Sequence, residues 1–286
     1  MSNGYLEAPM LKPEPQLWFR QFRAMLKIEL RKTLYSKRAI ASYVLASMPV
    51  IIMLIAALDV DSQGRRTFQS IEEAREVFGM IYTTLILGGV VFLGVASIFT
   101  TLLRGEILDR SIHYYVLTPV RRDIFILSKF AAGLGSAMLL FGGGTLICFL
   151  FLYLPFGTQQ LVSDLTNGIA IQQMGQYLGI TLLACMGYGS LFMAASLLFR
   201  NPLIPLVVIV TWETIHFILP PTLKLFSVIH YLKGLLPIPL DEGPLAIIVA
   251  PPPVWVSIVG MFGLCFVTVS GAVFLMKRLE VKYSDE

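Results

Sequence analysis

Residues 78–103 read FGMIYTTLILGGVVFLGVASIFTTLL, a run without a charged side chain. The run exceeds the roughly 20 apolar residues that take an α-helix across a bilayer. Over the whole chain 56% of the residues are hydrophobic and 14% are charged, which is more apolar than one water-soluble domain requires. We therefore expect an integral membrane protein made of a single transmembrane domain.

Further long hydrophobic runs flank this one on both sides. The predicted spans are residues 39–58, 78–103, 130–154, 177–199, 203–219 and 254–276. In hydrocarbon, backbone polar groups must be satisfied within a helix or a closed barrel, and these runs lack the alternation of barrel strands. The predicted fold class is therefore all-α with six transmembrane helices. Residues 220–253 are too polar and proline-rich for a further span, so we expect a re-entrant or interfacial segment on the outer side.

Lys and Arg residues are distributed unevenly around these spans. With the N-terminus inside, seventeen of the 22 fall on the inner side, five of them within residues 104–129. The positive-inside rule therefore predicts that both termini and this segment lie in the cytoplasm. We expect a multi-pass protein of the plasma (inner) membrane. The net charge of +4 follows from this topology, so nucleic acid is not an expected partner.

Residues 15–37, before the first span, show a different pattern. Apolar side chains recur at helical spacing on one face and basic side chains on another. Such an interfacial (elbow) helix is expected in the inner leaflet, with its cations near anionic headgroups. The residues expected at the membrane interface are Trp18, Phe19, Phe22, Arg20, Arg23 and Lys27. An ordinary amphipathic anchor that only orients the chain fits the same pattern.

The segment between the second and third spans, residues 104–129, reads RGEILDRSIHYYVLTPVRRDIFILSK. Its first half has apolar residues that share one side of a helix, with Glu106 and Arg110 at the favourable i,i+4 spacing. Thr118 has the character of an N-cap, and Pro119 then occupies the first helical position, where its missing N–H costs nothing. The pattern predicts a short helix, a cap and a second helix that leads into the third span.

This order of features resembles the coupling segment of type-2 ABC (ATP-binding cassette) exporter permeases. In that family an acidic residue at the end of the second span precedes Ser/Thr-Pro-Val, and Glu106 and Pro119 have the family's spacing. Thr118, Pro119 and Val120 match directly, whereas Arg110 and His113 stand where the family often has Gly and Glu. The interfacial helix, the six spans and the long outer segment are also similar to the family's plan.

The resemblance implies a transport subunit of the exporter type, which pairs with a second permease copy or a homologous permease and with a dimer of cytoplasmic ABC ATPases. The chain has no GxxxxGK[ST] loop, so we expect ATP and Mg on the partner ATPase and no cofactor or catalytic site in this chain. The residues expected to couple to the ATPase are Glu106, Asp109, Arg110, Ser111, Ile112, His113, Tyr114, Thr118, Pro119 and Arg121. Lipid, glycan, peptide and drug-like cargo all fit the resemblance.

Glu213 and His216 lie within the fifth predicted span. Ionisable groups in a span are costly and tend to face a protein interior or a water-filled cavity, so both are candidates for the translocation path. Two alternatives stay open: a secondary transporter or channel that uses the pair as an ion or proton site, and a polar clamp between helices. The three cysteines fall within spans without metal-type spacing, so no metal site is expected.

Glycines crowd certain faces of the spans, including Gly133 and Gly135 in the third and Gly187 and Gly189 in the fourth. Small residues allow helices to approach closely in a membrane. We expect these glycines to pack against neighbouring helices of the same chain.

Overall fold

A computed structural model describes residues 15–37, 39–59, 68–108, 122–199, 201, 203–216, 218–237 and 252–278. Within these ranges the regular elements are all helical, so the all-α class is confirmed for the described part of the chain. The elements are α1 (Pro15–Tyr35), α2 (Ala39–Leu58), α3 (Ile71–Ile81), η1 (Tyr82–Val91), α4 (Phe92–Leu108), α6 (Arg122–Ala137), η2 (Met138–Gly142), α7 (Gly143–Leu152), η3 (Leu154–Phe156), α8 (Thr158–Thr166), α9 (Ile169–Leu198), α10 (Leu203–Ile215), α11 (Pro221–Lys224), α12 (Val228–Lys233) and α13 (Val254–Arg278).

Five helical stretches of the described chain are long and apolar enough to cross a membrane. They are Ala39–Leu58, Ile71–Leu103, Arg122–Phe156, Ile169–Leu198 and Val254–Met276. The first and last have the predicted bounds, and the other three begin seven or eight residues before the predicted starts. The fifth predicted span, 203–219, is a shorter apolar helix that ends at Ile215. Its 13 residues cover about 20 Å at the helical rise, less than the roughly 30 Å of a hydrocarbon core.

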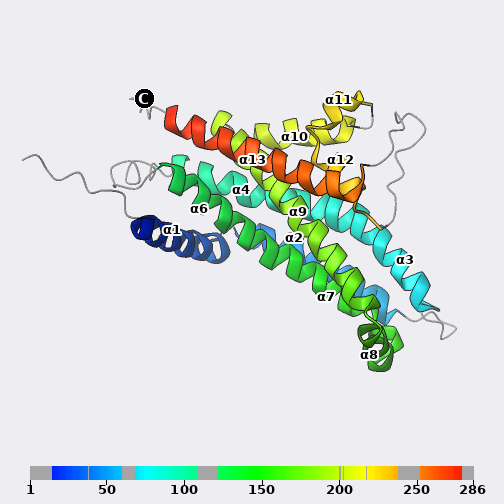
Figure 1. Ribbon diagram of the computed structural model, residues 1–286. Coiled ribbons are helices and arrows are strands. Elements are labelled where there is room, and N and C mark those ends of the chain that lie inside the picture. Colours follow the sequence, from blue (N-terminus) through cyan, green and yellow to red (C-terminus); the bar gives the residue numbers. More distant parts are fainter. Residues whose placement is uncertain are drawn as a thin grey trace, which may run out of the picture.

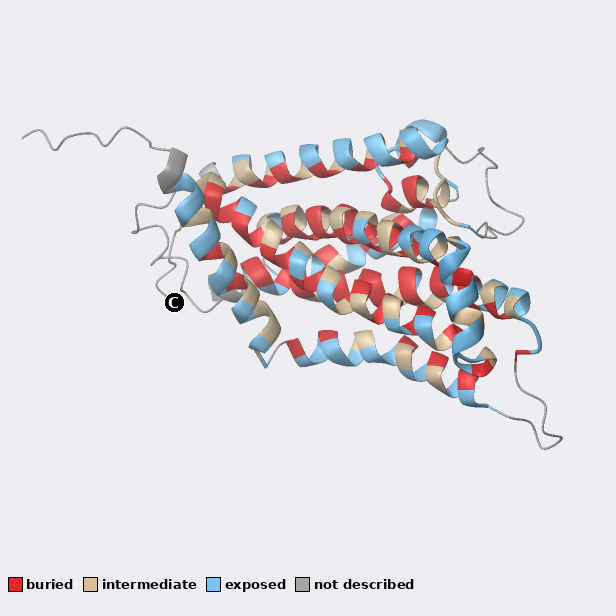
Figure 2. Cartoon of the chain, turned by 60° about the horizontal axis from the view of Figure 1, so that its bottom comes forward, coloured by how far each residue is buried: buried red, intermediate tan, exposed pale blue. Residues whose placement is uncertain are grey.

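Two of these stretches form the centre of the bundle. Within each stretch we consider an apolar segment of 18 residues. The buried share of this segment is 67% in the stretch that contains α3, η1 and α4 and 61% in α9, compared with 22% in α2 and in α13. The two central stretches pack against each other, while α2 packs on α7 and α13 packs on α9. Figure 2 shows the consequence, with buried residues on the inward faces of the helices and exposed residues on the outward faces.

Glycines allow neighbouring helices to approach closely in this core. A Cβ atom at Gly133 on α6 or at Gly189 on α9 would lie 2.7 Å or 2.6 Å from the ring of Phe99 on α4. Phe99 is fully buried, so its ring is enclosed by two neighbouring helices that lack side chains at the contact points. The expectation that these glycines serve packing within the chain is confirmed at both positions.

The two ends of the bundle differ in what they contain. Figure 1 shows α1 and the C-terminal end of α13 at one end, and α3 and α8 at the other. By the predicted topology, the end with α1 is the cytoplasmic one. The helices that flank the segment between the second and third spans, α4 and α6, also reach this end.

Candidate functional site

The described helices bracket the predicted coupling segment. α4 ends at Leu108 and α6 begins at Arg122, so the backbone of Glu106 belongs to the last turn of α4. The remaining predicted coupling residues lie outside the described residues: Asp109, Arg110, Ser111, Ile112, His113, Tyr114, Thr118, Pro119 and Arg121. The helix, cap and second helix expected there remain a prediction.

A buried lysine lies where α6 leaves this segment. Lys129 has no exposed surface, and its Nζ lies 3.1 Å from Oε1 of Glu29 on α1. The same ammonium donates a hydrogen bond to the carbonyl oxygen of Leu102 on α4, at 3.0 Å, and stands 5.0 Å from the centre of the Phe125 ring. One side chain therefore joins three helices. Removing one partner of such a buried ion pair typically costs about 3–5 kcal/mol because the other charge is left uncompensated.

The helix α1 packs along α6 rather than standing alone. Met25 and Glu29 are buried against the bundle, and Leu30 contacts the position of Gly135 on α6. The predicted interface residues are arranged around this contact: Phe22 is half-buried, whereas Trp18, Phe19, Arg20, Arg23 and Lys27 are exposed. A helix thus occupies Pro15–Tyr35 of the predicted 15–37, with aromatic rings and cations on its exposed face, and its location in the membrane interface remains a prediction.

A second contact ties the start of α6 to the end of α13. The guanidinium of Arg122 donates a hydrogen bond from Nη1 to the carbonyl oxygen of Met276, at 3.2 Å. Arg122 is the first residue of α6, and Met276 lies in the last turn of α13. The α6 helix is therefore connected at this end of the bundle to α1, α4 and α13.

The carboxylate of Glu213 binds the N-terminus of α12. It accepts hydrogen bonds from the Ser227 hydroxyl at 2.7 Å, from Val228 N–H at 2.9 Å and from Ile229 N–H at 3.2 Å. The first N–H groups of a helix have no partner within the helix and favour a negative charge nearby. Glu213 and Ser227 are both buried, so the acidic side chain supplies acceptors that water does not. Glu213 thus has the contacts that the polar-clamp interpretation requires.

His216 contacts the other end of the same short helix. Its ring Nε2 lies against the Lys233 ammonium, and its Nδ1 lies 2.7 Å from the carbonyl oxygen of Glu213. Burial and the nearby Lys224 lower the pKa of Lys233 to about 8, so the ammonium still predominates at pH 7. An ammonium only donates, so Nε2 is the acceptor and the ring proton is on Nδ1. Nδ1 then donates a hydrogen bond to the backbone carbonyl oxygen of Glu213. The predicted pair does not interact through the Glu213 carboxylate, which faces α12.

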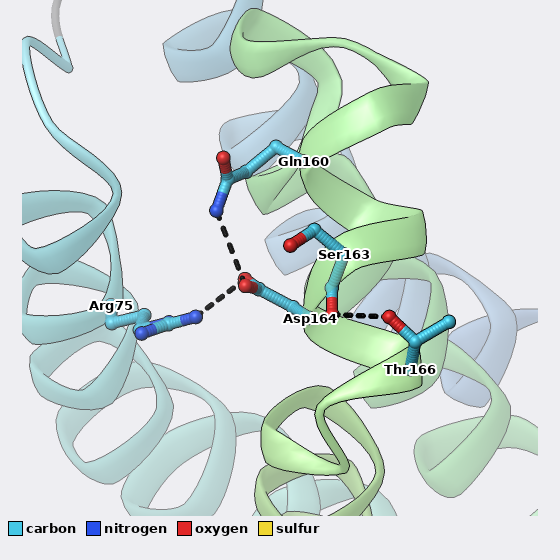
Figure 3. Close-up of polar contacts among 5 residues, drawn as sticks. All are labelled: Arg75, Gln160, Ser163, Asp164 and Thr166. Atoms are coloured by element: carbon cyan, nitrogen blue, oxygen red, sulfur yellow. Dashed lines mark hydrogen bonds and ion pairs between the residues drawn. The ribbon is translucent and has the colours of Figure 1, made fainter.

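The opposite end of the bundle has an ion pair of its own. The guanidinium of Arg75 on α3 lies 2.5 Å from Oδ2 of Asp164 on α8, and the amide of Gln160 donates to Oδ1 at 3.2 Å (Figure 3). Thr166 donates to the carbonyl oxygen of Ser163, which closes the last turn of α8. This pair fastens two outer helices together, and sequence reasoning assigned it no role.

Sequence reasoning also missed the Glu29–Lys129 pair. Glu29 is the one acidic residue in a helix dominated by basic and apolar side chains, and Lys129 borders the third span. Both positions carry a signal, because a charge on an apolar helix face needs a partner. Nothing local indicates that the two residues are partners.

Comparison with known proteins gives the chain a family. The family model of the ABC-2 family transporter protein matches residues 25–216. The chain belongs to this ABC-2 family. The match begins within α1, extends through the segment between the second and third spans and ends directly after α10. No curated protein and no solved structure matches the chain significantly.

Membership in the ABC-2 family confirms the resemblance to type-2 ABC permeases and makes the chain a multi-pass membrane permease of an ABC transporter. The ATPase of such an ABC-2 permease is normally a separate cytoplasmic subunit. Within the described ranges, no three His, Cys, Asp or Glu side chains converge on a point where a metal ion would bind. Two candidate functional regions are thus described in this ABC-2 permease. One is formed by the contacts of Lys129 with α1 and α4, and the other by the contacts of α10 with α12.

Proposed function

We propose that this chain is the transmembrane subunit of an ATP-driven exporter whose separate cytoplasmic ATPase binds residues 104–129. ATP and Mg are held by that partner, and this chain converts the partner's closure into a shift of its own helices. The observation that supports the proposal is the position of Lys129, which joins α1, α4 and α6 where α4 and α6 adjoin the segment. The exporter direction follows from the resemblance.

The contacts suggest how a push on the segment is transmitted. If α6 moved apart from α1, the Lys129 ammonium would lose the Glu29 carboxylate, and if α6 moved apart from α4, it would lose the Leu102 carbonyl. Because each loss removes a polar contact from a buried ammonium, the helices are expected to move as one rigid body. Arg122 extends the unit to α13 through Met276. The segment would therefore act on one end of four helices at once.

The remaining features of the assembly belong to the same proposal. The subunit pairs with a second copy or a homologous permease, in the plasma (inner) membrane, with both termini in the cytoplasm. The basic residues support this orientation, since most of them lie at the proposed inner side. The helix α1 lies in the inner-leaflet interface, because its exposed face includes Trp18, Phe19 and several cations.

The test is reconstitution of the complete complex with its ATPase. We expect Glu106→Gln, and separately the double replacement Thr118→Ala with Pro119→Ala, to reduce ATPase co-purification or ATP hydrolysis at least severalfold. Glu76→Gln on the exposed face of α3 is the matched control, because it removes the same charge at the opposite end of the bundle. Unchanged assembly together with unchanged hydrolysis in both coupling variants would refute the proposal.

A second candidate function is secondary transport through an ion or proton site at Glu213 and His216. Burial of both residues near the end of α10 is the observation in its favour. The three donors on the Glu213 carboxylate favour a structural role instead. Cargo movement that persists without ATP and stops in Glu213→Gln would support the secondary transporter.

A further inference from the structure

A cavity of about 240 Å³ lies between α1, α2 and α4. It is formed by the C-terminal half of α1, the turn that follows, the first residues of α2 and the cytoplasmic part of α4. The lining residues are Glu29, Lys32, Thr33, Ser36, Lys37, Ala39, Ser42, Ile98, Thr101 and Leu102. Small-molecule pockets usually measure about 300–1,000 Å³, so this cavity suits a compact group better than a drug-sized molecule.

The charges around the cavity favour an anion. Lys32 and Lys37 line it, and Glu29 is the single acidic residue among the lining residues. The Glu29 carboxylate lies 3.1 Å from the ammonium of Lys129, which is not among the lining residues and compensates the Glu29 charge. Among the described residues that line the cavity, the two lysines thus outnumber the one carboxylate, and that carboxylate has a cation of its own.

Hydroxyl groups add neutral donors beside the two lysines. Thr33, Ser36 and Ser42 line the cavity, and Ser42 is almost completely buried. The Thr101 hydroxyl is committed to the carbonyl oxygens of Ser97 and Ile98 in its own helix, at 2.7 Å and 2.9 Å. A combination of ammonium and hydroxyl donors is suited to the oxygens of a phosphate group.

The cavity lies where the chain turns from α1 into a membrane span. Tyr43 fixes this corner, because its hydroxyl donates a hydrogen bond to the Leu34 carbonyl oxygen at 3.0 Å. The first turns of α2 also expose Ile40, Tyr43 and Val44. A ligand here would thus have polar donors around its head and exposed apolar side chains beside it.

We propose that this cavity binds the phosphate headgroup of an anionic phospholipid, with Lys32 and Lys37 as its cationic contacts and the acyl chains in the surrounding leaflet. The lipid would fill the corner between α1 and α2 and brace α1 against the bundle. The proposal requires that the chain lies in a membrane, and it is independent of the ATPase.

The experiment measures lipid binding to the purified full-length chain by native mass spectrometry. The probes are dioleoyl phosphatidylglycerol, dioleoyl phosphatidylcholine and the soluble glycerol 1-phosphate. Each basic residue near a charged headgroup typically contributes about 1 kcal/mol, so we expect Lys32→Gln with Lys37→Gln to weaken phosphatidylglycerol binding about 25-fold. The control is Arg31→Gln, which removes one exposed charge from α1 that does not line the cavity, and it is compared with Lys32→Gln and Lys37→Gln made singly. It should change binding less than about threefold.

A cavity-filling variant, Thr101→Phe, tests the site without changing its charge. It should also abolish the preference for phosphatidylglycerol over phosphatidylcholine, and it decides the matter if the double lysine variant does not fold. A loss in Arg31→Gln equal to the loss in either single lysine variant would show general surface attraction and overturn the proposal. Glycerol 1-phosphate that displaces the lipid at equal concentration would assign the cavity to a soluble phosphate ester and overturn it as well.

Discussion

The ammonium of Lys129 and the carboxylate of Glu29 form a buried ion pair, 3.1 Å apart, between the third span and the helix that precedes the first. The two residues are exposed by 0% and 1%, so water contributes little to either charge. An amphipathic helix that only floated in a membrane interface would not need such a contact. The pair makes α1 a fixed part of the bundle and links it to the proposed coupling segment.

Lys129→Met should destabilise the protein strongly. The substitution leaves the Glu29 carboxylate buried without its cation, at a typical cost of about 3–5 kcal/mol, while Glu29→Gln with Lys129→Met should recover most of that loss. Thermal unfolding in detergent measures both, and Lys27→Met, at an exposed position of α1, is the control. Equal melting of Lys129→Met and wild type would contradict a stabilising pair.

Glu213→Ala should be less stable than Glu213→Gln. Alanine leaves the Ser227 hydroxyl and the N–H groups of Val228 and Ile229 without an acceptor, at about 1–3 kcal/mol for each buried donor that stays unpaired. Glutamine retains one carbonyl oxygen and should recover part of this. Chemical unfolding supplies the comparison, with exposed Thr214→Ala as the control on the same helix.

The same two variants separate structure from transport. If Glu213 is a clamp, transport by folded Glu213→Gln protein should match wild type at equal protein amounts. A folded variant that has lost transport would instead place Glu213 in the translocation path.

Lys233 should give the protein a pH-dependent stability at alkaline pH. Burial lowers its pKa from the ordinary 10.5 to about 8, so between these values the unfolded chain binds more protons at this residue than the folded protein does. The contribution of Lys233 to stability therefore increases as the pH rises from about 8 to 10.5 and is lost as the pH falls back through 8. From pH 7 to 10, the melting temperature of wild type should rise relative to that of Lys233→Met, and a constant difference would contradict the lowered pKa.

Gly189→Ala and Gly175→Ala should have opposite effects, although both lie in α9. A methyl group at Gly189 would stand 2.6 Å from the Phe99 ring, so the core must shift, at a typical cost of about 1–3 kcal/mol. At Gly175 nothing lies within 4 Å of the added atom, and alanine should gain about 0.5–1 kcal/mol from its higher helix propensity. Thermal unfolding of the two variants is the measurement. A destabilising Gly175→Ala would show that the helix needs glycine there for another reason.

Hydrophobic length alone predicted most of the membrane helices. The bounds 39–58 and 254–276 agree with the structure because the flanking residues are polar or proline. The central helices begin earlier than predicted because their outer turns are amphipathic and are stabilised by tertiary contacts. Ala74 on α3 and Ala170 on α9 are both buried at such turns. The polar residues in these outer turns lower the mean hydropathy, so a prediction from hydropathy leaves the turns out. Packing against the bundle keeps them helical.

The end of α10 illustrates the opposite error. Residues 203–219 form one apolar run in the sequence, yet the helix ends at Ile215 and His216 turns toward Lys233 on α12. The Glu213 carboxylate and the His216 ring each contact one end of α12. Contacts with α12, more than ten residues later in the chain, therefore decided where α10 ends. The hydrophobicity of residues 203–219 could not indicate this end point.

The sequence by itself determined the membrane character, the helical class and the family resemblance on residues 104–129, and it predicts the sidedness of the basic residues. These properties follow from the length of the hydrophobic runs, the number of charged residues and the spacing of nearby residues. Each of these is a local feature of the sequence and can be read without the fold. Only the tertiary structure decided which ionisable groups are partners, because Glu29 and Lys129 are a hundred positions apart and either one alone is simply a charge on an apolar helix face. The cost of burying an unpaired charge explains why each of them has a partner, and the packing of α1 on α6 decides which partner it is.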